Sequence, residues 1–81
     1  MTDDDLFDRI NELVDEEHHL DSKASPSDPL TEADQARLRE IEVRLDQCWD
    51  LLRQRRARRD AGLDPDDATV RPAETVEGYQ Q

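Results

Sequence analysis

The sequence predicts an all-α protein: two antiparallel helices form a hairpin, an extended C-terminal tail follows, and two hairpins dimerise into a four-helix bundle. Apolar residues recur every three or four positions in two long segments, which is the period of a helix. Only 33% of the 81 residues are hydrophobic and 41% are charged. Because so small a core leaves an isolated hairpin marginal, we expect a homo-oligomer, most simply a dimer.

The first helix is predicted over residues 3–22. Thr2 is a good N-cap, and the three aspartates that follow it favour the positive end of the helix dipole. The position skipped in the apolar series is Glu17, and a buried carboxylate needs a partner, for which we expect Arg37 across the hairpin. A ligand or proton-handling site is the alternative. The predicted core positions are Leu6, Ile10, Leu13 and Leu20, flanked by Phe7 and Val14.

The connection is predicted over residues 23–31, which contain two prolines and several turn-forming residues. The second helix is predicted over residues 32–61, with Thr31 as its N-cap and Gly62 as its stop. The second helix is longer than the first, so its C-terminal end extends beyond the N-terminal end of the first helix. Its apolar positions follow an unbroken heptad pattern and are Leu38, Ile41, Leu45, Cys48 and Leu52, flanked by Leu51.

The hairpin domain therefore covers residues 1–62, and residues 63–81 form the tail. Prolines and acidic residues interrupt the tail, and it has no helical period. We expect it to be extended and partly mobile. Docking of Val70, Val76 or Tyr79 on the hairpin is left open.

An arginine cluster lies at the end of the second helix. The helix alignment places it near the aspartates of the N-terminus, Asp3, Asp4, Asp5 and Asp8, and those of the tail, Asp60, Asp64, Asp66 and Asp67. These carboxylates can neutralise it, or it can contact an acidic protein partner. Weak nucleic-acid or phosphate binding is a third alternative, disfavoured by the net charge of −11 and by the lack of interleaved aromatic residues. The cluster consists of Arg53, Arg55, Arg56, Arg58 and Arg59.

A candidate metal motif lies near the end of the first helix. Glu16 and His19 form a Glu-x-x-His pair, the spacing that ferritin-like proteins use to bind iron or manganese, and Glu17 is a further candidate ligand. The chain has no second copy of this motif, so a dimer would have to supply it. A single copy is a weak signal, and we expect no cofactor.

The expected contact surface in the second helix surrounds its tryptophan. Cys48 is interpreted as a small apolar side chain, because neither histidine reaches it in this alignment. No phosphate loop, catalytic triad or metal-spaced cysteine pair is present in the sequence. The protein is therefore interpreted as a non-enzymatic interaction or assembly module, with the anchors Leu45, Cys48, Trp49 and Leu52.

The single cysteine, the acidic N-terminus and the lack of a long apolar run predict a cytoplasmic protein without membrane contact. Residues 13–18, 37–42, 45–57 and 71–79 together resemble a family of small acidic actinobacterial proteins known only as a domain of unknown function. The block from Asp46 to Asp50 is the most specific part of this likeness. The resemblance implies a bacterial cytosolic protein, and it brings no activity, cofactor or site residues.

Overall fold

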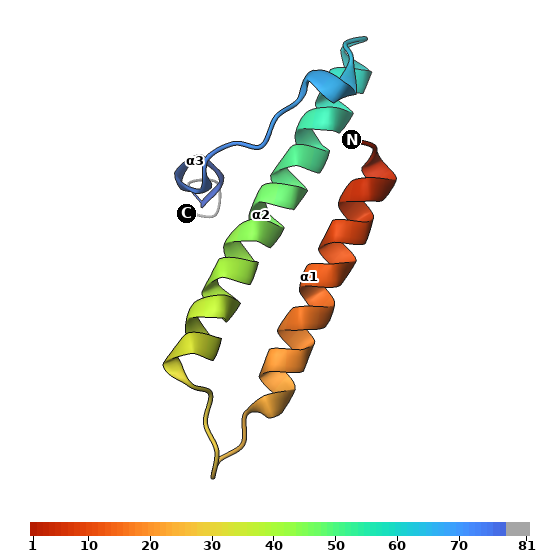
Figure 1. Ribbon diagram of the computed structural model, residues 1–81. Helices are drawn as coiled ribbons and strands as arrows, with labels where there is room; N and C mark the ends of the chain where they lie inside the picture. Colours follow the sequence, from red (N-terminus) through yellow and green to blue (C-terminus); the bar gives the residue numbers. More distant parts are fainter. Residues whose placement is uncertain (78–81) are drawn as a thin grey trace.

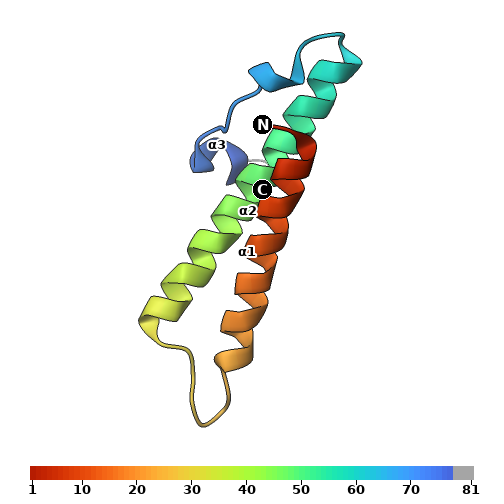
Figure 2. The ribbon, with the colours of Figure 1, turned by 45° about the vertical axis from the view of Figure 1, so that its right-hand side comes forward.

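The computed structural model describes residues 1–77 and contains two long helices. They are α1 (Asp3–Lys23) and α2 (Glu32–Asp60), followed by the short 3-10 helix η1 (Pro65–Asp67) and by α3 (Ala73–Glu77). α1 and α2 lie side by side and run antiparallel (Figures 1 and 2). The all-α prediction is confirmed, and the ends of both long helices fall within one residue of the predicted bounds. Dimerisation stays a prediction.

Local capping explains where the long helices begin and end. Thr2 and Asp5 form a reciprocal capping box: the Thr2 hydroxyl accepts from the Asp5 N–H at 3.1 Å, and the Asp5 carboxylate accepts from the Thr2 N–H at 2.9 Å. The Thr31 hydroxyl accepts from the Asp34 N–H at 3.1 Å in the same way. α2 ends before Gly62, whose φ of 75° suits a residue without a Cβ.

The core lies between α1 and α2 and is thin. All four predicted positions of α1 are buried, from Leu6 to Leu20. Of the five predicted positions of α2, Ile41 is fully buried, whereas Leu38, Leu45, Cys48 and Leu52 are half-buried. The Cα positions extend over 54 × 26 × 16 Å, so the molecule is long and narrow, and α1 and α2 form a single layer (Figure 1). A single layer of helices cannot enclose both sides of its apolar seam.

The tail differs from the prediction of an extended segment. It forms η1 and α3 and folds back along α2 on the side away from α1 (Figure 1). Val76 is 2% exposed and anchors α3, whereas Val70 remains 57% exposed. Tyr79 lies outside the described residues. The tail is therefore part of the folded unit, because docking on α2 supplies the apolar contact that a five-residue helix lacks by itself.

Candidate interaction surface

Three of the five clustered arginines are engaged within the chain, as the helix alignment predicted. Arg55 is only 7% exposed in its side chain, and its guanidinium lies 2.7 Å from an Asp3 oxygen and 2.9 Å from an Asp66 oxygen. Arg59 contacts the same Asp3 carboxylate at 2.8 Å. Arg58 donates to the Asp64 carbonyl at 2.6 Å and lies 3.5 Å from an Asp67 oxygen. These contacts tie the start of α1, the end of α2 and η1 together.

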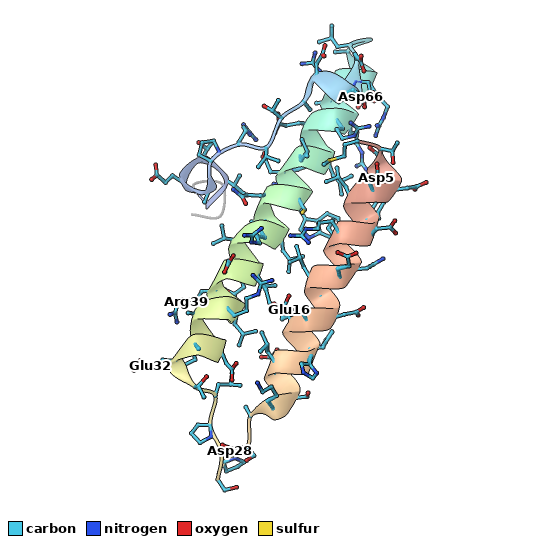
Figure 3. All side chains as sticks on the ribbon, viewed as in Figure 1. Asp5, Glu16, Asp28, Glu32, Arg39 and Asp66 are labelled. Carbon is cyan, nitrogen blue, oxygen red and sulfur yellow. The ribbon has the colours of Figure 1, made fainter. Side chains whose placement is uncertain are left out.

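The acidic partners contribute unequally to this end of the molecule. Hydrogen bonds from Arg59 and Arg55 hold the pKa of Asp3 below its usual value. Asp5 caps α1 instead of pairing with an arginine, and the Asp64 carboxylate accepts from the Asp66 N–H at the start of η1. Figure 3 shows Asp5 and Asp66 at the same end of the molecule. The other predicted partners, Asp4, Asp8 and Asp60, make no ion pair within residues 1–77.

Arg53 and Arg56 behave differently from their neighbours. Both side chains are exposed, and neither makes an ion pair with a carboxylate of the described residues. The cluster therefore divides into a structural part and a free part.

The prediction that Arg37 pairs with Glu17 is wrong, because its partner is the preceding residue, Glu16. Arg37 binds Glu16 through two parallel hydrogen bonds, of which the Nη2–Oε1 distance is 2.7 Å. Figure 3 shows Glu16 on the side of α1 that faces α2. Both side chains are more than one-third exposed, at 39% and 35%. Burying a carboxylate costs free energy, and two long side chains at the edge of the helix interface can pair without that cost. This explains why Arg37 pairs with the partly exposed Glu16.

The candidate metal residues are not brought together. Glu16 is engaged by Arg37, and the side chain of His19 is exposed. Within residues 1–77, no group of three or more histidine, cysteine, aspartate or glutamate side chains is arranged to hold a metal ion. Glu16, Glu17 and His19 therefore form no ligand set in the described part of the chain.

Cys48 lines a groove of about 410 Å³ between α1, α2 and the tail, together with Arg9 and Arg44. Burial raises the pKa of its thiol above the ordinary value, although the two arginines oppose this effect. The thiol is therefore protonated at neutral pH and is a poor nucleophile. This environment suits the packing role that the sequence predicted.

Sequence reasoning missed the polar contact that docks the tail. Asp50 is 0% exposed, and its carboxylate accepts hydrogen bonds from the Arg71 guanidinium and, at 2.9 Å, from Gln54. Gln54 also donates to the Thr69 carbonyl at 2.9 Å, and Gln47 donates to the Arg71 carbonyl at 3.3 Å. The available signal was the spacing of Gln47, Asp50 and Gln54, which places three polar residues on one side of α2.

An exposed aromatic pair lies on the flank of α2 opposite the groove that Cys48 lines. The rings of Phe7 and Trp49 meet edge to face with centroids 6.5 Å apart, yet the two residues remain 46% and 44% exposed. They line a hollow of about 300 Å³ together with Leu52, the two free arginines and the paired side chains of Asp3 and Arg59. We call this surface the Trp49 face, and it consists of Phe7, Trp49, Leu52, Arg53 and Arg56.

Of the four predicted anchors, Trp49 and Leu52 belong to the Trp49 face. Leu45 and Cys48 pack instead against the cluster formed by Leu13, Leu20 and Ile41. The structure thus places the predicted charged contacts Arg53 and Arg56 beside the predicted aromatic anchor. Arg55 and Arg58 lie outside this hollow, and Arg59 lines it while paired with Asp3, so these three arginines serve the fold.

The comparison with known proteins agrees with the resemblance read from the sequence. Residues 2–81 match DUF2630, described as a protein of unknown function. The chain belongs to the DUF2630 family. An uncharacterised protein of Mycobacterium bovis and another of Mycobacterium tuberculosis are each 50% identical over 78 residues, covering 96% of this chain and 90% of the relative. No solved structure matches the chain.

Membership in DUF2630 fixes the family and gives no activity, since the family's description and its mycobacterial relatives' names state none. Within residues 1–77, no helix is long and apolar enough to cross a membrane. The chemistry of the surface must therefore support any functional proposal.

Proposed function

We infer that this DUF2630 chain is a non-enzymatic, cytosolic module that acts by protein–protein contact, and that the Trp49 face is its contact surface. One observation carries the proposal. Two half-exposed aromatic side chains share one face with two arginines that have no carboxylate partner in the described chain, although the net charge is −11.

The chemistry of the Trp49 face supports an interface. Aromatic residues and arginine are enriched at the centre of protein interfaces and contribute most of the binding energy there. Trp49 and Phe7 already pack against each other, so a partner would meet a pre-formed aromatic pair. Little side-chain entropy is then lost on binding.

A second copy of the chain is the proposed occupant. The hairpin is thin, and the leucines of α2 at positions 38, 45 and 52 are only half-buried. Packing two hairpins face to face would complete their burial and form a four-helix bundle. The gain in buried apolar area would offset the small core of the single chain.

The alternatives have less support. Nucleic-acid binding is disfavoured because Arg55, Arg58 and Arg59 are engaged by carboxylates of the same chain. Two of the five clustered arginines remain free, on a chain whose net charge of −11 repels phosphates. The single cysteine is half-buried and has no partner for an internal disulfide, which agrees with a reducing compartment.

Sedimentation equilibrium of the full chain tests the proposal. The average mass should rise from monomer towards dimer between low-micromolar and near-millimolar concentration, and Trp49→Ala should move this transition to higher concentration. Leu63→Ala is the control, because Leu63 is also exposed, at 53%, but lies outside the Trp49 face. A monomeric mass across the whole range would contradict self-assembly, and equal effects of the two substitutions would contradict the assigned surface.

A further inference from the structure

A stripe of charged residues runs along α2 on the side of the Trp49 face. Alternating spacings of three and four place its members on one side of the helix. Trp49 stands at the centre of the stripe. Its members are Arg39, Glu42, Asp46, Trp49, Arg53, Arg56 and Asp60.

These charges have no counterpart within the described chain. All six charged side chains are exposed except Asp46, which is half-buried, and none makes an ion pair with another residue of the 1–77 range. Figure 3 shows Arg39 projecting from α2 on the side away from α1. Most other cations of the same chain are paired, including Arg37 and Arg44, which lie on α2 outside the stripe.

The order of the charges is self-complementary. Towards the C-terminus, the stripe is positive, negative and negative before Trp49, and it is positive, positive and negative after Trp49. If a second α2 runs in the opposite direction, every charge meets a charge of opposite sign. A parallel α2 in the same register would instead place like charges together.

We propose that a second copy of the chain packs on the Trp49 face with its α2 antiparallel, about a twofold axis at Trp49. The arrangement rests on the proposed function, because it specifies the occupant's orientation on that same surface. It brings Glu42 to the partner's Arg56 and Asp46 to the partner's Arg53. The two Trp49 rings, each with its own Phe7, meet at the axis.

The charges also select the register of this contact. With Trp49 at the axis, Arg39 lies opposite the partner's Asp60, so all three kinds of pair are attractive. A slide of about one turn in one direction places Arg39 opposite the partner's Arg56. A slide in the other direction places Glu42 opposite the partner's Asp60. Each of these registers keeps one attractive kind of pair, Glu42 with Arg53 or Asp46 with Arg56, and adds one repulsive kind. The charges therefore favour the register with Trp49 at the axis over both neighbours.

The pair formed by Glu42 and Arg56 gives a test that only contact between chains can satisfy. The two residues are fourteen positions apart, about 21 Å along α2, so they cannot touch within one chain. Any energetic coupling between them must therefore arise across the interface. Both are exposed and lack partners within residues 1–77, so substitution should leave the helices intact.

The experiment compares dimer dissociation constants of the full-length wild type, Glu42→Arg, Arg56→Glu and the double variant by sedimentation equilibrium. Each single variant places like charges together at two symmetric contacts and should weaken the dimer about tenfold. The double variant restores opposite charges and should recover to within about threefold of the wild type. Asp15→Arg, an exposed position without an ion pair in the described chain, controls for the change in net charge.

The outcomes separate this arrangement from the proposed function. Recovery in the double variant, with helix content unchanged by circular dichroism, supports the antiparallel contact. If the wild type dimerises but the double variant loses as much dimer affinity as the two single variants combined, the antiparallel orientation is wrong. The Trp49 face can then still be the assembly surface. A wild type that stays monomeric overturns both.

Discussion

Asp50 on α2 and Arg71 in the tail form an ion pair in which the carboxylate is fully buried. The two residues are 21 positions apart in the sequence, and their contact joins the tail to the middle of α2. The fold therefore depends on a polar contact as well as on the leucine-rich seam.

Removing this guanidinium should release the tail. Arg71→Ala leaves the Asp50 carboxylate buried with fewer donors, and we expect the free energy of unfolding to fall by about 2 kcal/mol. One-third exposure of the Arg71 side chain keeps the loss moderate. Urea denaturation measures it, and hydrogen exchange at the Val76 amide should become faster. Arg9→Ala, which removes an exposed pair with Glu12 on α1, is the control and should have little effect on either measurement.

The same contact predicts how stability depends on pH. Hydrogen bonds from Arg71 hold the pKa of Asp50 below its ordinary value of 3.8, so near that pH the unfolded chain binds more protons than the folded one. The stabilisation is complete above 3.8 and is lost as the pH falls through the lower pKa of the folded state. The difference in unfolding free energy between wild type and Asp50→Asn should therefore shrink on acidification. A difference that stays constant or grows would show that this carboxylate is not the titrating group.

Neighbouring arginines should differ sharply in their effect on stability. Arg55→Ala removes the contacts with Asp3, Asp66 and the Pro65 carbonyl, and it should lower the melting temperature of the dilute protein. Arg55→Lys should restore little, since one ammonium group cannot reproduce the forked contact of a guanidinium. Arg56→Ala, one position away, should leave the melting temperature of the dilute protein nearly unchanged. Equal losses at the two positions would refute the division of the cluster.

The end of α2 depends on backbone conformation at one glycine. Gly62 has a φ of 75°, and the next N–H, from Leu63, donates to the Arg58 carbonyl at 2.7 Å. No atom lies within 4 Å of a Cβ built on Gly62, so Gly62→Ala would create no clash. It should nevertheless cost about 1 kcal/mol, because a residue with a Cβ disfavours this conformation. Gly62→Asn should cost less, and urea denaturation of both variants compares them.

The sequence predicted the two long helices well because their signals are local. Thr2, Thr31 and Gly62 mark helix ends through contacts with residues at most four positions away. The prediction that Glu17 pairs with Arg37 failed because sequence spacing does not reveal which glutamate at the edge of the helix interface can reach the arginine. α3 could not be predicted from its own five residues, since its burial depends on Gln47, Asp50 and Gln54 in α2, and polar residues at a helix surface usually face solvent.

The Trp49 face was only partly predictable for a similar reason. Trp49 and Leu52 stood out beside the heptad pattern, as did the arginine cluster. Which arginines are free depends on where Asp3 and Asp66 lie, and only the folded chain fixes those positions. Phe7 joins Trp49 because α1 and α2 are antiparallel and in register.

Intrinsic fluorescence tests the central claim most directly, because Trp49 is the only tryptophan of the chain. If two copies associate through the Trp49 face, its emission should shift to shorter wavelength as the indole leaves water. The shift should follow the same concentration dependence as the increase in mass. A dimer that forms while the emission stays constant would place the interface elsewhere and contradict the account.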